Sequence, residues 1–341
     1  MLRLIDANLN RMSEGLRTLE DVARFLLNDA ALSSRLKSLR HDLAVEDASL
    51  RRNLLSVRDS ADDVGAFAEV EGEAHRQDLP NIVNANAKRV EESLRVLEEF
   101  AKLPEIMLDS AKFKQARFAL YDIERELTAK ILRRDKRVSG LYVIIDPEAL
   151  GGRDEVEVAQ KAISGGAKAI QLRDKNRNKG EILSKAEELK ALCAQSDVLF
   201  IVNDYLDIAI ASNADGLHLG QEDLPISAAR QLLPIDTIIG CSTKTIAAAL
   251  QAQTDGADYV AVGSMYPTAS KTDTHVVGLE TLRQIREAIS IPIIAIGGIN
   301  AKNAGEVMAA GADSIAVISA VLGAEDVEEA ARQLAKSMEV H

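Results

Sequence analysis

The sequence predicts an α/β protein of two parts, an all-helical domain with an internal duplication followed by a (β/α)8 TIM barrel. Charged segments with helical periodicity fill the first part, and one of them occurs twice. In the remainder, short apolar runs alternate with helix-patterned segments. The length of 341 residues suits two domains of ordinary size. We therefore expect a helical domain over residues 1–136 and a barrel over residues 139–341.

The first part of the chain contains a repeated helix. Residues 5–23 align with residues 83–101, and nine of the 19 aligned positions are identical. In both copies apolar residues recur at steps of three and four, which predicts one buried stripe on each helix. A second helical segment follows each copy, at residues 33–51 and 110–130, so we predict two related hairpins in an antiparallel bundle. The stripes are Leu9, Met12, Leu16, Leu19 and Ala23, and Ala87, Val90, Leu94, Leu97 and Ala101.

Eight short apolar runs predict the strands of the barrel. Helical patterns such as residues 181–195 and 279–289 lie between them, and this alternation over some 200 residues is typical of a (β/α)8 barrel. A doubly wound open sheet is the alternative. The runs are residues 141–145, 169–173, 198–202, 216–220, 237–241, 259–263, 292–297 and 314–318.

The composition excludes several classes of partner. Hydrophobic residues make up 47% of the chain and charged residues 28%, which is typical of a globular protein. The formal net charge of −12 disfavours broad attraction to nucleic acid. No membrane-length apolar run or secretory pattern is present, so we expect a cytoplasmic protein without membrane partners. The spacing of Cys193 and Cys241 predicts reduced, structural thiols.

Polar residues follow several of the predicted strands, where a barrel of this kind carries its chemistry. Gln171, Arg173 and Lys175 alternate at the end of the second run, which suits a clamp on a polyanion. A solvated strand end is the alternative. Asp204 and Asp223 follow the third and fourth runs, and such a carboxylate pair can hold one Mg²⁺. Asp223 as an ordinary helix N-cap is the competing interpretation.

The later strand ends add hydroxyl, amine and glycine positions. The loop "SMYPTASKTDT" after the sixth run is rich in donors, and "IGGIN" and "VIS" end the last two runs. Backbone amides after those two strands form the usual phosphate cradle of this barrel. This cradle is separate from the cation clamp and the carboxylate pair, so together they indicate two phosphorylated substrates. His218, inside the fourth run, is expected to have a packing or supporting role. The candidates here are Ser242, Thr268, Ser270, Lys271, Gly297, Gly298 and Ser319.

The ordered motifs "QLRDK", "VND", "GLHLGQED", "GCS", "YPTASK" and "AIGGI" closely resemble the thiamine-phosphate synthase family. The resemblance covers nearly all of residues 139–335. It implies a Mg²⁺-dependent transferase that joins hydroxymethylpyrimidine diphosphate to thiazole phosphate and releases pyrophosphate. Asp174 stands where the family commonly has Glu, which is a conservative departure. A thiazole tautomerase of the same superfamily is the alternative, and it needs no diphosphate clamp.

The resemblance also implies a role for each matching residue. Arg173, Lys175, Ser242 and Lys271 would be catalytic, and Asp204 and Asp223 would bind Mg²⁺. The pyrimidine diphosphate would be held by Gln171, Arg173, Asp174, Lys175, Asn203, Ser242 and Lys271. The thiazole phosphate would be held by Thr268, Ser270 and Gly298, with Ile318 and Ser319 nearby.

Three N-terminal motifs, "IDANLNRMSEGLRTLEDVARF", "VRDSADDVG" and "NANAKRVEESLRVLEEF", are similar to a small helical family. That family occurs alone or fused to thiamine-phosphate synthase and is associated with phosphorylation of hydroxymethylpyrimidine phosphate. The similarity implies ATP as a substrate, although no nucleotide-binding fingerprint is present. A noncatalytic module for homo-oligomerisation or effector binding is the alternative; Asn8 as an N-cap and i,i+3 ion pairs are the simpler interpretations of the repeat. The candidates are Asn8, Arg11, Arg58, Asp59, Asp63, Asn86 and Arg89.

Overall fold

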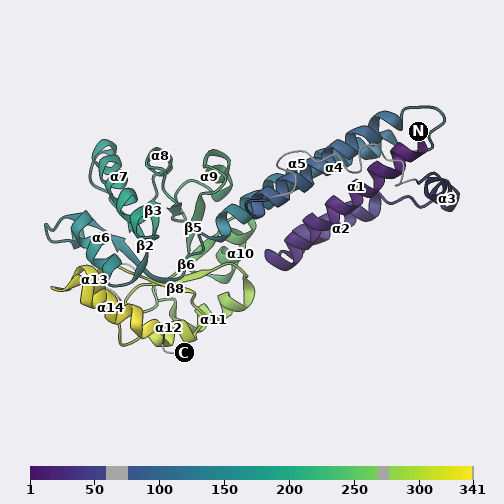
Figure 1. Cartoon of the computed structure of the whole chain (residues 1–341). Helices are drawn as coiled ribbons and strands as arrows, with labels where there is room; N and C mark the ends of the chain where they lie inside the picture. The colour runs from purple at the N-terminus through teal and green to yellow at the C-terminus, as the bar shows by residue number, and fades with distance from the viewer. Residues whose placement is uncertain (59–75, 268–275, 340–341) are drawn as a thin grey trace. The chain divides into compact units, whose positions relative to one another are not determined.

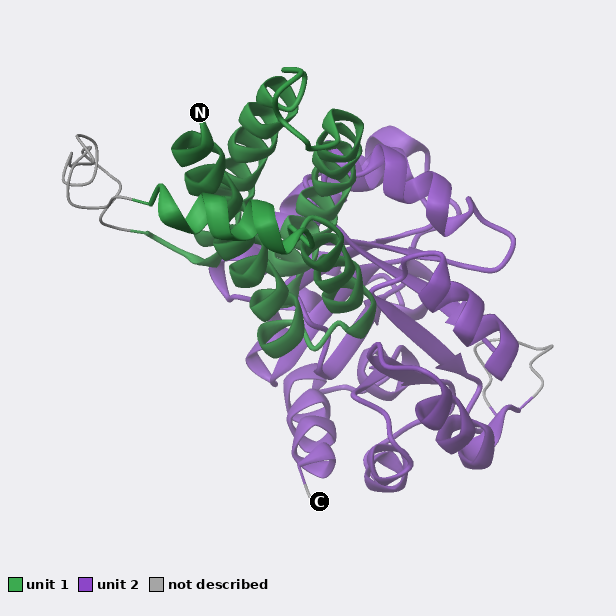
Figure 2. Cartoon of the chain, turned by 90° about the vertical axis from the view of Figure 1, so that its right-hand side faces the viewer, with its two compact units in different colours: residues 1–134 green, residues 135–341 purple. Residues whose placement is uncertain are grey.

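The computed structural model describes residues 1–58, 76–267 and 276–339 of the chain (Figure 1). By its internal contacts the chain divides into two compact units, Met1–Arg134 and Asp135–His341 (Figure 2). In the described ranges, no helix is both long enough and apolar enough to cross a membrane.

In its described part the first unit consists of helices and the loops that connect them, and its long helices form two hairpins. The single helical segment predicted over residues 33–51 is wrong. The chain leaves the helix at residue 43, and Asp47 starts a new one by accepting a hydrogen bond from Leu50 N at 2.6 Å. Helix α1 packs against α2 and α4, and α4 packs against α5. The elements are α1 (Leu2–Asp21), the π-helical turn η1 (Val22–Leu26), α2 (Ala30–Asp42), α3 (Ala48–Ser56), α4 (Leu79–Phe100) and α5 (Ser110–Arg134).

The two copies of the repeated helix, α1 and α4, pack directly against each other through their predicted stripes. Leu16 and Leu19 in α1, and Leu94 and Leu97 in α4, are completely buried. Gly15 marks the close approach, because a Cβ there would lie 2.5 Å from Val90 Cγ2. The internal duplication therefore builds the core of this unit.

Each copy also carries a buried glutamate that reaches an arginine of the following helix. Glu20 lies 3.0 Å from Arg40 of α2, and Glu98 lies 2.9 Å from Arg117 of α5. Both glutamates pair in addition with the arginine three residues earlier. The i,i+3 interpretation is therefore correct for Arg17 and Glu20, but its outer face is wrong, because Glu20 is buried. The duplication has therefore preserved an ion-pair connection within each hairpin as well as an apolar stripe.

The second unit is a closed barrel of eight parallel strands in sequence order, which confirms the predicted fold class. The open-sheet alternative is wrong, because β1 pairs with β8 as well as with β2. The helices lie around the outside of the strands (Figure 1). The strands are β1 (Gly140–Ile145), β2 (Ala167–Leu172), β3 (Leu199–Asn203), β4 (Gly216–Leu219), β5 (Ile238–Thr243), β6 (Tyr259–Gly263), β7 (Ile293–Ile296) and β8 (Ser314–Val317). The helices are η2 (Pro147–Ala149), α6 (Glu155–Ser164), α7 (Lys179–Gln195), α8 (Leu206–Ala211), α9 (Ile226–Leu232), α10 (Ile246–Thr254), α11 (Gly278–Ala288), α12 (Ala304–Ala309), α13 (Ser319–Leu322) and α14 (Val327–Met338).

Alternation along the strands separates two cores. In β1, Leu141, Val143 and Ile145 pack among the outer helices, whereas Tyr142 and Ile144 belong to the cluster inside the barrel. Strands that are buried on both faces read as continuous apolar runs, which explains why the runs were visible in the sequence. The two cysteines are buried and unpaired, as predicted.

Candidate active site

A cavity of about 1020 Å³ opens where the barrel strands end. Every one of the eight strands, or the loop that follows it, contributes to its lining. This is the face on which a (β/α)8 barrel carries its active site. The sequence-predicted residues that line the cavity are Gln171, Arg173, Asn203, His218, Ser242, Gly297, Gly298, Ile318 and Ser319, whereas Asp174, Lys175, Asp204 and Asp223 are not among its lining residues.

The cationic side of the cavity begins at the end of β2. Gln171 is buried inside the barrel, and the guanidinium of Arg173 is ion-paired with Asp146. Asp146 follows β1 directly and also accepts a hydrogen bond from Glu148 N at 3.1 Å. Sequence reasoning missed Asp146, although an acid immediately after a buried strand was a usable signal. The pairing holds Arg173 at the cavity with a defined orientation.

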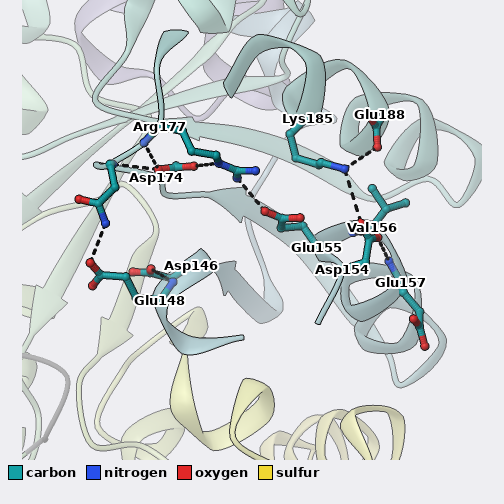
Figure 3. A network of polar contacts seen from close by, with 11 residues as sticks. Asp146, Glu148, Asp154, Glu155, Val156, Glu157, Asp174, Arg177, Lys185 and Glu188 are labelled. Carbon is teal, nitrogen blue, oxygen red and sulfur yellow. Dashed lines mark hydrogen bonds and ion pairs between the residues drawn. The ribbon is translucent and has the colours of Figure 1, made fainter. Parts of the chain in front are cut away.

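Asp174 was predicted to contact substrate, but in the structure its carboxylate binds its own loop. Its carboxylate accepts hydrogen bonds from Asn176 N and Arg177 N at 2.9 and 3.1 Å and pairs with the Arg177 guanidinium, which reaches Glu155 at 2.7 Å (Figure 3). Burial raises the pKa of Asp174, but these hydrogen bonds outweigh it, and the pKa lies below its usual value. Asp174 therefore organises the loop between β2 and α7 that carries Lys175.

The two acids predicted to bind metal approach each other at the ends of β3 and β4. Burial and the carboxyl group of Asp223 raise the pKa of Asp204, while Lys175, 3.3 Å away, opposes this shift. Asp204 has a left-handed backbone with φ of 62°, a conformation that is uncommon for residues other than glycine and often marks a functional position. The N-cap interpretation of Asp223 is wrong, because α9 is preceded by Pro225 and Asp223 instead accepts from Gly220 N at 2.6 Å.

The opposite side of the cavity is formed by glycine backbone after β7. Gly297 and Gly298 have φ of 100° and 69°. A Cβ on Gly297 would overlap Ser264, and one on Gly298 would lie 2.7 Å from Pro267 O. Only glycine allows the chain to turn this closely beside the cavity. Ile318 and Ser319, after β8, line the same region, whereas Thr268, Ser270 and Lys271 lie outside the described residues.

A chain of polar side chains crosses the barrel interior at the cavity, and all of its members except Tyr259 line the cavity. Gln171 Nε2 donates to Tyr142 Oη at 2.8 Å, and Tyr142 Oη lies 3.3 Å from Tyr259 Oη. His218 bridges onward, with Nδ1 3.1 Å from Tyr259 Oη and Nε2 3.0 Å from Ser242 Oγ. Burial raises the pKa of both tyrosines, so both hydroxyls keep their protons. The supporting role expected for His218 agrees with this geometry; the two tyrosines were missed because they lie within apolar runs.

The N-terminal candidates occupy two kinds of position. Asn8 and Asn86 lie within α1 and α4, and each donates to the carbonyl four residues earlier, at 2.9 and 2.8 Å. The N-cap interpretation of Asn8 is therefore wrong. Arg11 and Arg89 are exposed on the same two helices. Asn8 is equivalent to Asn86, and Arg11 to Arg89, in the two copies of the repeat.

Arg58, another of the N-terminal candidates, makes a bidentate contact with Asp6. Its guanidinium binds both carboxylate oxygens of Asp6, at 2.8 and 2.9 Å, so the chain before residue 59 is tied to α1. Asp6 was missed because nothing in the motif around it marked it as a partner of Arg58. Asp59 and Asp63 lie outside the described residues.

Comparisons with known proteins find relatives of both units. The family model described as "Thiamine monophosphate synthase" matches residues 141–321, and that of the "ThiD2 family" matches residues 3–126. The chain is similar to the thiamine-phosphate synthase of a Synechocystis species, with 40% identity over 97% of this chain and 94% of the relative. It is 42% identical to that of a Synechococcus species over the same shares. A solved structure, "Thiamine phosphate pyrophosphorylase" from Pyrococcus furiosus, matches 61% of this chain and 98% of its own with 46% identity and a TM-score of 0.56.

Proposed function

The chain belongs to the thiamine-phosphate synthase family, and we propose that it joins a hydroxymethylpyrimidine diphosphate to a thiazole phosphate in the cavity at the barrel mouth. The observation that carries this proposal is the convergence of Gln171, Arg173, Asn203 and Ser242 from three strands on one cavity. A thiazole tautomerase needs no diphosphate clamp, so the cations at the end of β2 favour the synthase.

The reaction needs no nucleophile from the protein. The bond between the pyrimidine methylene carbon and the diphosphate oxygen breaks, and its electron pair leaves with pyrophosphate. The pyrimidine amino group donates electron density to the methylene as this happens, and the thiazole nitrogen uses its lone pair to form the new carbon–nitrogen bond. The protein therefore contributes charge stabilisation and orientation.

Arg173 and Lys175 are the groups that stabilise the leaving diphosphate in this proposal. Arg173 is three-quarters buried and held by Asp146, so its charge is already oriented before the substrate arrives. Lys175 is more exposed and pairs with Asp204. Asn203 and Ser242 line the neighbouring part of the cavity and hold the pyrimidine end.

Asp204 and Asp223 would hold Mg²⁺. Two carboxyl groups that face each other in a partly buried place repel when both are ionised, and a divalent cation removes that repulsion. No cluster of three or more His, Cys, Asp or Glu occurs in the part of the chain that the structure describes, which suits a cation that takes its other ligands from water and phosphate. When bound, Mg²⁺ would supply Lewis-acid neutralisation of the diphosphate charge.

The thiazole phosphate is assigned to the glycine side of the cavity. Gly297 and Gly298 bring backbone close to the space there, and Ser319 adds a hydroxyl after β8. A phosphate fixed at this edge holds the thiazole nitrogen in place for its attack, which is an advantage of proximity.

For the helical unit we propose phosphoryl transfer from ATP to hydroxymethylpyrimidine phosphate, which would produce the substrate of the barrel. The match to the ThiD2 family over residues 3–126 supports this, and the paired Arg58 and Asp6 mark one candidate position. The competing proposal is a noncatalytic unit for homo-oligomerisation or effector binding. An experiment with residues 1–136 alone distinguishes the two proposals. Consumption of ATP that depends on the pyrimidine monophosphate supports the kinase, and a stable dimer that consumes no ATP supports the structural role.

The full-length protein tests both activities in two parallel reactions. One contains the pyrimidine monophosphate, ATP, Mg²⁺ and thiazole phosphate; the other contains the pyrimidine diphosphate, Mg²⁺ and thiazole phosphate. Thiamine phosphate in both supports the bifunctional enzyme, and thiamine phosphate only in the second removes the kinase proposal. Absence of product from the second reaction would refute the proposal for the barrel.

A further inference from the structure

Three buried side chains of the barrel have no role in the function proposed so far. Tyr142, Tyr259 and His218 connect Gln171 to Ser242 through an unbroken series of hydrogen bonds. Gln171 and Ser242 come from β2 and β5, on different sides of the barrel, and both line the cavity. Tyr142 and His218 line the same cavity, and Tyr259 joins them below it, so the three residues link two groups that the substrate would meet.

One arrangement of the protons uses each hydroxyl of the chain as a donor once, and it gives the chain a direction. In this arrangement Tyr142 accepts from Gln171 Nε2 and donates to Tyr259, and Tyr259 donates to His218 Nδ1. A neutral imidazole that accepts at Nδ1 carries its proton on Nε2 and donates it to Ser242 Oγ. The hydroxyl proton of Ser242 is then directed elsewhere, and Gln171 retains its carbonyl oxygen as an acceptor.

We propose that Tyr142, Tyr259 and His218 are positioning residues that fix the hydrogen-bonding polarity of the pyrimidine subsite. Gln171 presents an acceptor and Ser242 presents a donor. This matches an aminopyrimidine, whose amino group donates and whose ring nitrogens accept. An oxopyrimidine reverses the pattern at the substituted position, and a site with oriented polar groups rejects such an analogue strongly. The inference rests on the proposed function, in which Gln171 and Ser242 hold the pyrimidine.

The packing around Tyr259 keeps the chain in one arrangement. A Cβ on Gly240 would overlap the Tyr259 ring, so the ring occupies the space that glycine leaves on β5. The His218 ring stacks on Tyr259 with centroids 5.7 Å apart, and Tyr142 meets Tyr259 edge-on at 6.5 Å. These contacts leave the hydroxyl of Tyr259 between its two partners.

Tyr259→Phe in the full-length protein removes one link and keeps the ring. We expect kcat/KM for the pyrimidine diphosphate to fall about 10-fold, since a buried partner is left unsatisfied. We expect KM for thiazole phosphate to stay within about twofold and the preference for the amino over the 4-oxo pyrimidine to shrink by a similar factor. Tyr121→Phe, which removes a phenolic hydroxyl in the helical unit, is the matched control. A Tyr259→Phe enzyme with wild-type kcat/KM and wild-type preference would overturn the proposal.

The tautomer of His218 gives a test that needs no turnover. In ¹⁵N-histidine-labelled protein, the His218 signals, identified by their loss in His218→Gln, should report a proton on Nε2. A proton on Nδ1 would refute the direction of the chain even in an active enzyme. His218→Gln keeps an N–H near the Nε2 position and should retain several-fold more activity than His218→Leu; equal activity of the two would show that only packing matters. Failure of the wild-type enzyme to form thiamine phosphate would count against the proposed function, not against the tautomer.

Discussion

Both units of this protein bury polar side chains, but they use them differently. In the helical unit, Glu20 and Glu98 are closed off by arginines of the same hairpin. In the barrel, Gln171 and Ser242 are connected to neighbours and also line a cavity. A polar group whose partners all lie within the fold stabilises that fold, whereas one that also faces a cavity can bind a ligand.

The largest effect is expected at the cation that faces the cavity. Arg173→Ala should lower turnover of the pyrimidine diphosphate at least about 100-fold, the scale of one lost charge-stabilising group. Asp204→Ala should do the same if the carboxylate pair holds Mg²⁺. Initial rates of thiamine phosphate formation measure both. Arg332→Ala, which removes an arginine paired on the outer helix α14, is the control. A loss of only two- or threefold in either site variant would mean that the active site has been misplaced.

The next effect concerns the space that Tyr259 occupies. Gly240→Ala should displace the Tyr259 ring, because the new Cβ overlaps it, and thereby disturb both His218 and Tyr142. We expect kcat/KM for the pyrimidine diphosphate to fall about 10- to 100-fold, with some loss of thermal stability from overpacking. Gly256→Ala, where no atom lies within 4 Å of the added Cβ, tests the cost of losing a glycine with positive φ. If Gly240→Ala retains full activity, the ring has room to move and the rigid chain is wrong.

A smaller effect is expected in the network that supports the β2–α7 loop. Arg177→Met leaves the buried Asp174 without its cation and should loosen the loop that carries Lys175 (Figure 3). We expect KM for the pyrimidine diphosphate to rise about 10-fold while kcat changes less. Lys185→Met is the control, because Lys185 pairs with Glu188 and Asp154 and not with Asp174 (Figure 3). An equal rise in KM in both variants would assign the effect to general destabilisation.

Substitutions of the buried glutamates in the helical unit should lower its stability and leave synthase turnover unchanged. Glu98→Gln and Glu20→Gln each weaken one of the duplicated connections, and each should lower the free energy of unfolding by about 1–2 kcal/mol. The value lies below that of a fully buried pair because Arg17 and Arg95 are about half exposed. Urea denaturation followed by circular dichroism measures the loss, and Glu99→Gln, beside Glu98 but in exposed pairs, should change little. Clearly different losses for Glu20 and Glu98 would show that the two hairpins are not energetically equivalent.

The sequence was sufficient for the fold class because the relevant signals are local. The period of the stripes in α1 and α4, and the continuous apolar runs of strands buried on both faces, both survive in a single sequence. Strand ends directed attention to Arg173, which lines the cavity, and to Asp204 and Asp223, whose role in binding Mg²⁺ stays a prediction. Tyr142 and Tyr259 could not be recognised, because a tyrosine inside an apolar run looks like core until the barrel closes and brings their hydroxyls together. The end of the helix at residue 42 could not be recognised either, because the helical pattern of residues 33–51 continues without a break past the N-cap residue Asp47.

The least effect at neutral pH is expected at Cys193, a buried group outside the cavity. Burial, with a smaller contribution from Asp215, raises the pKa of its thiol from 9.0 to about 12. Below pH 9 the thiol is neutral in the folded and unfolded states, so it adds no pH dependence. Between pH 9 and about pH 12 the unfolded chain releases the proton while the folded one retains it, so stability should fall as the pH rises. Cys193→Ala should flatten this fall in urea denaturation measured from pH 8 to 10.5, and an unchanged slope would mean that the thiol titrates normally. Since neutral Cys193 is also a poor nucleophile, native protein at pH 8 should leave it unalkylated.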